Sequence, residues 1–312
     1  MIDNDRTLNA IHLASLSSMD AIVTSATFDG NWESTINFIK DVAFKADLRS
    51  VLKTVQERKL VIVDLCSGTG AYGLALGYVL GAPCHIHFVD IVGEYHEIAK
   101  SAAKSILPDK SVVECHTCSA DDTPIASGSV DIVIEVDGFH HCPSLPSVMK
   151  EAHRILRYSG TLLAVDRVHE NRVSRSKLDA LLDFQYPQEW LTQRCYASTK
   201  LTRRENGESE LKLDDWMLAF SANRWMNITR TTYVKRGFNS FKYYIISQFP
   251  DRLLPSRKWP LPTPWPFPLL LTILFGITLR NRPSAVLTNV YSLVPPGLFS
   301  FKIRSVFSAV KI

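Results

Sequence analysis

The strongest constraint on the fold lies at residues 60 to 70, where the apolar run Leu-Val-Ile-Val-Asp-Leu passes directly into Cys-Ser-Gly-Thr-Gly. A buried strand followed at once by a glycine turn is typical of a strand-turn-helix unit, in which backbone N–H groups and a positive helix end face a ligand. Asp64 lies inside this unit, and its carboxylate would repel a phosphate group. The turn therefore favours a ligand that carries positive charge.

Apolar runs alternate with segments of helical spacing after residue 60. We expect helices at 71–80, 94–106 and 145–156, and strands at 60–65, 85–89, 111–115, 130–136 and 161–165. Strands that are apolar on both faces and separated by helices indicate a parallel sheet covered by helices, with ligands at the C-terminal ends of the strands. The fold class is therefore α/β, with a Rossmann-like, doubly wound and mostly parallel sheet.

The chain beyond the fifth strand predicts further parts of the same domain. A polar insertion at about 167–212, with a helix at 177–184, precedes a helix at 213–225. Two β-rich runs, 226–234 and 241–249, flank the short link Lys-Arg-Gly, which predicts an antiparallel hairpin at the sheet edge. We therefore expect seven strands, the last of them antiparallel.

Segments of different composition flank this domain. Apolar residues recur at helical spacing between 31 and 56, so residues 1–58 predict a helical N-terminal cap. Seven prolines between Pro250 and Pro268 exclude helix and central strand. We divide the chain into the cap, a ligand-binding domain at 59–250, and a C-terminal extension at 251–312.

The extension is basic and aromatic, with eight basic residues against one acid after Pro250. Such a composition suits either peripheral contact with a membrane or a segment that wraps around its own domain. Its apolar run, 269–279, is shorter than the roughly 18 residues of a spanning helix. No basic patch lies near the predicted crevice, so nucleic acid is not an expected partner.

The start of the chain, Met-Ile-Asp-Asn-Asp-Arg, has no basic stretch followed by an apolar core, so we expect a cytoplasmic protein without a secretory signal. The six cysteines are then expected to be reduced thiols. A zinc site built from Cys115, Cys118, His140, His141 and Cys142 is the alternative, but a single C-x-x-C lacks the second pair that makes this signal specific. We assign no metal ligand.

The glycine turn matches two kinds of cofactor site. Gly68-x-Gly70-x-x-Gly73, with Asp90 twenty residues after Gly70, fits the dinucleotide fingerprint of an NAD(P)-dependent oxidoreductase. S-adenosylmethionine also has a ribose for Asp90, but it carries a sulfonium and an ammonium in place of phosphates. Asp64 therefore favours S-adenosylmethionine.

Five motifs in order resemble those of class I S-adenosylmethionine-dependent methyltransferases, in the small-molecule group with the type-11 methyltransferase domain. They are Asp64-Leu-Cys-Ser-Gly-Thr-Gly70, Phe88-Val-Asp90-Ile, Ser119-Ala-Asp-Asp-Thr-Pro124, Val130-Asp-Ile-Val-Ile-Glu-Val-Asp-Gly-Phe-His-His141 and the segment from Glu151 to Leu163. The resemblance covers about 60–165. It implies cofactor contacts from Asp64, Ser67, Gly68, Gly70, Asp90, Ile91, Ala120, Asp121 and Glu135.

The resemblance also implies individual roles. Gly68 and Gly70 would let the backbone approach the cofactor, Asp64 would lie near its amino-acid end, and Asp90 would bind both ribose hydroxyls. Ala120 would give its N–H to the adenine. The chain departs from the family at two positions. Ser119 replaces an acid that accepts from the adenine amine, so Asp121 or Asp122 would make that contact. Cys66 replaces a glycine. The alternative roles are a turn-capping acid for Asp64 and a helix N-cap for Asp90.

The resemblance places the acceptor pocket at and just after the fourth strand. His140 or His141 is our candidate for a base that deprotonates an alcohol acceptor. For His141 a packed, backbone-bonded structural role is the alternative. Asp137, Arg167 and His169 are candidate substrate-binding residues, with a solvated loop as the alternative for the last two.

These observations predict an S-adenosylmethionine-dependent methyltransferase that methylates an oxygen or nitrogen of a small or lipid-linked acceptor, with a slight preference for a glycan hydroxyl. Two alternatives stay open: an NAD(P)-dependent oxidoreductase, and a non-catalytic, membrane-associated assembly factor with a methyltransferase-like domain.

Overall fold

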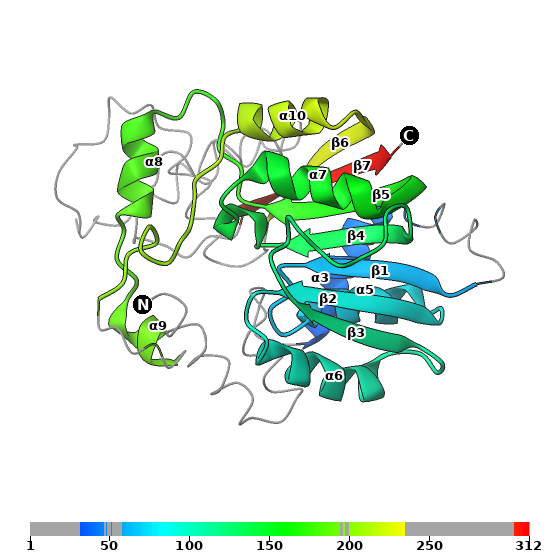
Figure 1. Ribbon diagram of the computed structural model, residues 1–312. Coiled ribbons are helices and arrows are strands. Elements are labelled where there is room, and N and C mark those ends of the chain that lie inside the picture. Colours follow the sequence, from blue (N-terminus) through cyan, green and yellow to red (C-terminus); the bar gives the residue numbers. More distant parts are fainter. Residues whose placement is uncertain are drawn as a thin grey trace, which may run out of the picture.

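The computed structural model describes residues 32–46, 48, 51, 58–193, 196, 200–234 and 303–311. The elements in chain order are shown in Figure 1. They are α3 (Trp32–Lys45), β1 (Leu60–Leu65), α5 (Ala71–Leu80), β2 (Cys84–Asp90), α6 (Tyr95–Ile106), β3 (Val112–Thr117), β4 (Val130–Val136), the 3₁₀ turn η1 (Phe139–His141), α7 (Leu145–Ile155), β5 (Leu156–Asp166), α8 (Arg175–Leu182), α9 (Gln188–Gln193), α10 (Leu213–Ala222), β6 (Trp225–Val234) and β7 (Ile303–Lys311).

The seven strands form one sheet in the order β3-β2-β1-β4-β5-β7-β6. Pairing is parallel from β3 through to β5, and β7 runs antiparallel to both β5 and β6. The strand order reverses between β1 and β4, and in such sheets ligands bind at the C-terminal ends of the strands at this point. The predicted mostly parallel, doubly wound sheet with an antiparallel last strand is confirmed.

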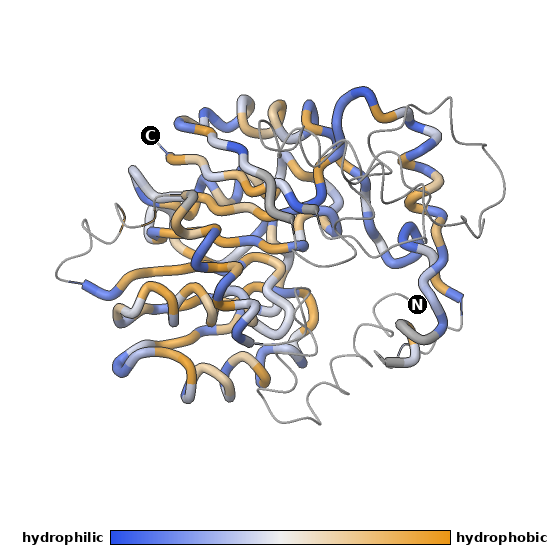
Figure 2. Tube along the Cα trace, turned by 180° about the vertical axis from the view of Figure 1, so that it is seen from behind, coloured by the Kyte–Doolittle hydropathy of each residue, from blue (hydrophilic) through white to orange (hydrophobic). Residues whose placement is uncertain are grey.

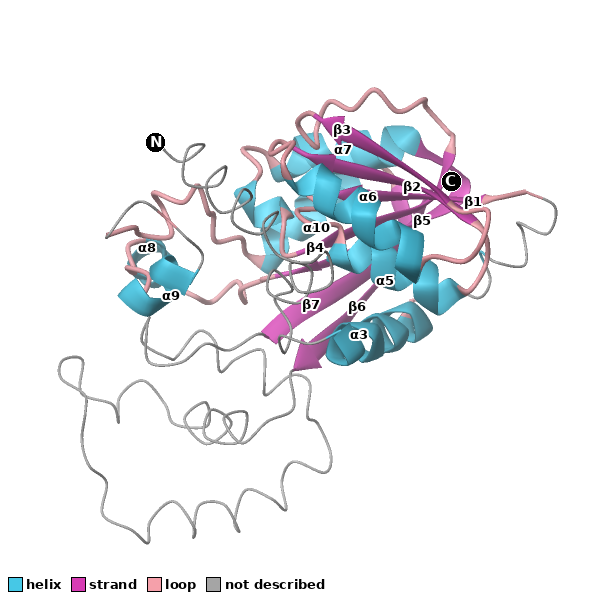
Figure 3. Ribbon diagram, turned by 90° about the horizontal axis from the view of Figure 1, so that it is seen from below, coloured by secondary structure: helices cyan, strands magenta, loops and turns pink. Residues whose placement is uncertain are grey.

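Helices cover both faces of the sheet (Figure 3). Ile86 and Phe88 of β2 lie in the core shared with α3, α5 and α6, whereas Val63 and Leu65 of β1 lie in the core shared with α7 and α10. Hydrophobic stretches run along the strands of the sheet (Figure 2). The central strands β1 and β4 are buried along almost their whole length, as expected for strands covered on both sides. The insertion that carries α8 and α9 lies beyond the C-terminal ends of the parallel strands, where Figures 1 and 3 both show it.

The bounds of β1, β4 and α5 agree with those predicted from the sequence. The fifth strand begins earlier than the predicted residue 161, because β5 starts at Leu156, directly after α7. Val130 pairs with Leu156, but Ile132 pairs with Thr161, so residues 157–160 form a bulge opposite β4. Ser159 adopts a left-handed φ of 63° within this bulge.

The partner of β6 corrects the predicted hairpin. β6 pairs with β7, whose residues 303–311 come from the predicted C-terminal extension, and 241–249 lie outside the described residues. Val306 packs on the α5 side of the sheet, whereas Phe307 and Ala309 pack on the α7 side. A strand buried on both faces belongs inside the sheet, so the predicted boundary at residue 250 does not hold for 303–311.

Of the predicted N-terminal cap, residues 32–46, which include α3, and the single residues 48, 51 and 58 lie in the described part of the chain. α3 packs on the same face of the sheet as α5 through Phe38, Ile39 and Val42, which are fully or almost fully buried. Within the described residues, no helix has the length and apolar character needed to cross a membrane.

Phe307 provides a test of the placement of β7. Its buried ring stacks on Trp216 of α10 with ring centroids 4.9 Å apart. Phe307→Ala should lower the free energy of unfolding by about 3–5 kcal/mol, because it leaves a cavity in the core. Leu218→Ala, at a side chain 66% exposed on α10, is the matched control and should change it by no more than about 0.5 kcal/mol. Denaturant unfolding of both variants measures the difference, and equal losses would show that β7 lies outside the core.

Candidate active site

The glycine turn after β1 forms a tight cradle. Gly68 and Gly70 have φ values of 50° and 79°, and Gly70 is the N-cap of α5. A Cβ at Gly70 would lie 2.9 Å from atoms of Ala99 and Phe88, and a Cβ at Gly73 would lie 2.8 Å from Asp64 Oδ2. Glycine at these positions lets the start of α5 pack closely on β1 and β2. The turn is tied to β2 by the N–H of Ser67, which donates to Val89 O at 3.0 Å.

Asp64 is buried at the C-terminal end of β1. Its Oδ2 accepts the N–H of Gly73 at 2.9 Å, which agrees with the turn-capping role considered for it. Burial raises the pKa of Asp64 to about 8, against the opposing effect of that hydrogen bond. Asp64 makes no ion pair with any residue in the part of the chain that the structure describes. A cation next to this carboxylate would therefore be stabilised strongly.

The other predicted cofactor residues follow the ends of β2 and β3. Asp90 Oδ2 accepts the N–H of Gly68 at 2.7 Å, and Oδ1 accepts the N–H of Val92 at 3.0 Å. The N-cap of α6 is Glu94, so Asp90 does not have the capping role considered above. The side chain of Ile91 is about half exposed, and Ala120 is buried beyond β3. Asp121 accepts a hydrogen bond from Ser119 Oγ.

The cradle fits S-adenosylmethionine. The hydroxyl of Ser67 is buried and makes no hydrogen bond in the described structure, so it has capacity for a polar ligand. Asp64 and Asp90 offer carboxylates at the ends of adjacent strands. Gly68 and Gly70 have no side chain that would keep a ligand away from the backbone of the turn. A phosphate would meet the Asp64 carboxylate at this turn, whereas a sulfonium and an ammonium would be attracted to it.

Glu135 of β4 connects the cradle with the following turn. Its fully buried carboxylate accepts the N–H of Gly138 at 2.6 Å and of Phe139 at 3.2 Å. The second oxygen, Oε2, has no hydrogen-bond partner within the described structure. Burial, and then the negative charge of Asp166, raise the pKa of Glu135 well above its ordinary value. A Cβ at Gly138 would lie 2.4 Å from Cys66 Cβ, so the turn after β4 needs glycine to pack against the cradle.

His140 and Asp166 form a buried pair at the ends of β4 and β5. His140 Nδ1 lies 2.6 Å from Asp166 Oδ1. The carboxylate also accepts the backbone N–H of His140 at 2.9 Å and of Arg167 at 2.6 Å. Because the Asp166 carboxyl group accepts these N–H groups, the hydrogen-bond network assigns the ring proton of the neutral His140 to Nδ1 and leaves Nε2 unprotonated.

The pKa of His140 lies well below its ordinary value, chiefly because of burial and next because of the positive charge of Arg167. Burial raises the pKa of Asp166, while Arg167 opposes that rise. His140 is therefore a neutral imidazole at neutral pH, and a neutral imidazole is the form that accepts a proton.

Asp137 is bound by a residue that the sequence did not indicate. Arg304 of β7 contacts both oxygens of the Asp137 carboxylate, with Nη2 to Oδ2 at 3.0 Å. Burial alone would raise the pKa of Asp137, but the charge and hydrogen bonds of Arg304 outweigh burial and hold the pKa below its ordinary value. Asp137 has a left-handed φ of 57°, and its N–H donates to Val165 O at 2.8 Å. The ion pair therefore joins the turn after β4 to β7.

Arg167 and His169 point toward acids of the insertion. Arg167 pairs with Glu208 at 2.5 Å and with Glu210 at 3.4 Å, and His169 Nε2 contacts Glu210. Arg203 pairs with the same two glutamates, and all five side chains are buried. The solvated loop considered for Arg167 and His169 is therefore not what the structure shows.

The same insertion loop contacts the backbone of His140, the candidate base. Both the N–H and the hydroxyl of Ser209 donate to His140 O, at 2.7 and 2.8 Å. The loop from Arg203 to Glu210 thus covers the ends of β4 and β5.

His141 and the residues of the alternative zinc site are the last groups indicated by the sequence. His141 donates its N–H to Gly138 O at 2.9 Å, and its ring lies against that of His140 with centroids 4.4 Å apart. This backbone bond agrees with the structural alternative for His141. Cys115 and Cys118 do not join His140, His141 and Cys142 in any group of described side chains close enough to share a metal ion, and the five described cysteines are free thiols.

Sequence reasoning missed Arg304, Glu208 and Glu210. For Arg304 a signal exists: in Ile-Arg-Ser-Val-Phe-Ser-Ala-Val-Lys, polar residues interrupt an apolar run as they do in a strand. The two glutamates lie in a polar loop, whose pattern does not reveal that it folds back over the sheet.

Known proteins resemble the part of the chain that holds the cradle. Residues 63–164 match the family model of the methyltransferase domain. The demethylmenaquinone methyltransferase of Lactococcus lactis subsp. lactis is 30% identical over 110 residues, which cover 35% of this chain and 43% of that protein. The ubiquinone/menaquinone biosynthesis C-methyltransferase of Sinorhizobium fredii is 28% identical over 107 residues, or 34% of this chain and 40% of that protein. The chain thus matches less than half the length of these relatives.

A solved structure agrees with the fold. A candidate sarcosine dimethylglycine methyltransferase from Galdieria sulphuraria superposes with a TM-score of 0.53 at 16% identity, over 89% of this chain and 87% of that protein. The ordered motifs, the family match at residues 63–164 and the cradle that favours a cationic ligand agree with one another. The chain therefore carries a class I S-adenosylmethionine-dependent methyltransferase domain.

Proposed function

We propose that the whole protein transfers a methyl group from S-adenosylmethionine to a small or lipid-linked acceptor, and that His140 removes a proton from a hydroxyl of this acceptor. The observation that carries the proposal is the buried His140–Asp166 hydrogen bond of 2.6 Å at the edge of the sheet where the cofactor cradle also lies. The fixed tautomer leaves His140 Nε2 as a base, and the low pKa of His140 keeps it unprotonated.

The cofactor half of the site uses the residues around the cradle. Gly68 and Gly70 would admit S-adenosylmethionine close to the backbone, Asp64 would hold its cationic amino-acid end, and Asp90 its ribose. Ser67, Ile91, Ala120, Asp121 and Glu135 would complete the cofactor contacts. When bound, S-adenosylmethionine supplies an electrophilic methyl group on a sulfonium.

The acceptor half uses the turn after β4. Positioning an acceptor accounts for much of the acceleration of an in-line transfer, and a base is needed only when the attacking atom is a poor nucleophile. The Arg304–Asp137 pair and the network of Arg167, His169 and Glu210 would hold the walls of this pocket in place.

The acceptor atom that we propose is oxygen or nitrogen, with a hydroxyl favoured by the His140 base. The matched relatives are named for menaquinone and ubiquinone biosynthesis, and one of them is named a C-methyltransferase. A base also serves that reaction when it ionises a ring hydroxyl, because the negative charge is shared with the ring carbon beside it.

The methylated product identifies the acceptor. Mass spectrometry would compare extracts of deletion and wild-type cells and search for pairs of compounds that differ by one methylene unit. Carbon NMR of the product would then assign the methyl group to oxygen, nitrogen or carbon.

Asp64 should make cofactor binding depend on pH. Its pKa of about 8 exceeds its ordinary value, so between about pH 4 and 8 the free protein holds a proton that a bound cation would displace. The affinity for S-adenosylmethionine should therefore rise with pH by up to about tenfold per unit between pH 6 and 8. Asp64→Asn should bind more weakly at pH 8 and lose most of this dependence. Titration calorimetry in two buffers of different ionisation enthalpy measures the released proton.

The control for Asp64→Asn is Asp109→Asn, at an exposed carboxylate in the loop between α6 and β3. This variant should keep the pH dependence of the wild type. If Asp64→Asn also keeps it, the cation does not lie beside Asp64.

His140 should control the chemical step rather than cofactor binding. His140→Gln should lower kcat by about 10² to 10⁴ at saturating S-adenosylmethionine, with its affinity for the cofactor nearly unchanged. His141→Gln is the control and should lose far less. In the wild type, kcat should stay constant as pH falls through 6.5 and decline only below it, because the pKa of His140 is lowered. A His140→Gln variant that binds cofactor and keeps the wild-type kcat would exclude this base and favour the non-catalytic alternative.

Peripheral contact with a membrane remains a proposal about residues 251–302, which lie outside the described residues. It rests on their composition, in which basic residues lie on either side of the aromatic residues Trp259, Trp265 and Phe267. Truncation after residue 249 would also remove β7, so substitutions in the full chain are the better test. The wild type should sediment with anionic lipid vesicles, and Trp259→Ala/Trp265→Ala should do so several-fold less. Equal sedimentation of the two proteins at low and at high salt would refute the contact.

A further inference from the structure

Three histidines and one glutamate, none of them assigned to the methyltransferase site, gather on one face of β2 and β3. His85 and His87 lie two residues apart on β2, and Glu114 and His116 lie two residues apart on β3. Residues two apart in a strand point to the same side, and the parallel register pairs His87 with Glu114. The intervening Ile86 and Cys115 point to the opposite face, against the core with α5 and α6. The four polar side chains therefore converge on the other face.

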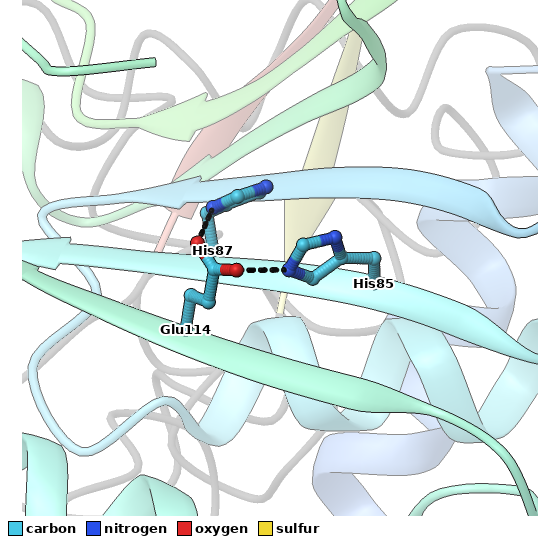
Figure 4. A group of neighbouring side chains, drawn as sticks. All are labelled: His85, His87 and Glu114. Carbon is cyan, nitrogen blue, oxygen red and sulfur yellow. Dashed lines mark ion pairs between the residues drawn. The ribbon is translucent and has the colours of Figure 1, made fainter.

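The carboxylate of Glu114 lies between two imidazole rings (Figure 4). Its Oε1 is 3.2 Å from His85 Nε2, and its Oε2 is 3.5 Å from His87 Nδ1. His116 adds a fourth group, with Nε2 3.0 Å from His87 Nδ1 and 3.9 Å from Glu114 Oε2. One ligand atom each from His85, His87 and Glu114 lies within 4.8 Å of the others.

These separations match those between ligands on one tetrahedral metal ion. With metal–nitrogen bonds of about 2.0–2.1 Å, two ligand atoms at the tetrahedral angle lie about 3.3–3.4 Å apart. The four distances given above, 3.0 to 3.9 Å, bracket this value. His85, His87 and Glu114 form the set whose ligand atoms all lie within 4.8 Å of one another, and His116 stands beside this set and would have to move toward the ion to complete it. A second observation agrees: His85 Nε2 is shielded from solvent and makes no hydrogen bond, although Glu114 is close by. This nitrogen therefore has an unused ligand position directed at the cluster.

We propose that His85, His87, Glu114 and His116 form a binding site for Zn²⁺. Neutral imidazole and carboxylate are ligands for borderline transition metals, whereas Mg²⁺ and Ca²⁺ prefer sites built only from oxygen. The bound ion would replace the contact between His87 and His116. β3 is the edge strand of the sheet, so the ion would join the edge strand to β2.

The site is open enough for metal to enter. The side chains of His85 and His116 are 26% and 19% exposed, and that of Glu114 is 51% exposed. The partly exposed position of Glu114 also means that replacing it should leave the fold intact. The competing explanation is that polar side chains only protect an edge strand from pairing with another chain, and this explanation predicts no specific metal affinity.

Metal titration of the full-length protein, made without a histidine tag and stripped of metal, tests the site. The wild type should bind one Zn²⁺ per chain with micromolar or tighter affinity, and Mg²⁺ should not compete. Glu114→Gln should weaken binding at least tenfold, and His85→Asn/His87→Asn should abolish it. The matched controls are Glu97→Gln, at an exposed glutamate on α6, and His153→Asn, on α7. Both should bind as the wild type does.

Two further measurements distinguish this site from the thiols of the chain. Co²⁺ in place of Zn²⁺ should give the intense visible bands of a tetrahedral ion without the near-ultraviolet band of a thiolate ligand. Zn²⁺ at one hundred times its dissociation constant should shift the unfolding equilibrium about 100-fold toward the folded state in the wild type, and not in the double variant. Zinc binding of unchanged strength in His85→Asn/His87→Asn, or a thiolate band with Co²⁺, would overturn the proposal.

Discussion

Buried carboxyl groups at the C-terminal ends of the central strands are the constraint around which the site is built. Asp64 on β1, Glu135 on β4 and Asp166 on β5 are all almost fully buried. Moving an ionised carboxylate from water into a protein interior is costly unless hydrogen bonds or cations compensate. The chain compensates Asp166 with two backbone N–H groups and the nearby Arg167. Asp64 has one backbone N–H and no cation from the described chain. This difference explains why a cationic cofactor suits the β1 end of the crevice.

The charges around the turn after β4, where we propose that the acceptor binds, are compensated by distant parts of the chain. Arg304 meets Asp137 across 167 positions in the sequence, and the acids of the insertion meet Arg167 across about 40 positions. Arg304 is in place only when β7 has been inserted between β5 and β6. The geometry of the turn after β4, and with it the position of His140, therefore depends on completion of the sheet. The cofactor cradle is thus held by local contacts, whereas the turn after β4, where we propose that the acceptor binds, requires the whole fold.

This division also explains which features the sequence predicted. β1, the glycine turn and α5 follow each other without interruption, so their apolar run, glycines and helical spacing define them locally. The same holds for β4, whose apolar residues are buried on both faces. β7 was missed because its partner strands are far away in the sequence and the short link after residue 234 resembles a hairpin. His140 was found as a candidate base, but its choice over His141 rests on Asp166, which only the folded chain brings to 2.6 Å.

The division bears on substrate specificity as well. The family match ends at residue 164, immediately before Asp166, Arg167 and the insertion. The residues that cover His140 and hold Asp137 therefore lie outside the matched segment. A pocket wall made of ion pairs that depend on each other is rigid, because removing one partner leaves a buried charge uncompensated. If the proposed function holds, the loop from Arg203 to Glu210 and Arg304 of β7 would restrict which acceptors reach His140. Acceptor choice would then follow from these residues rather than from the matched domain.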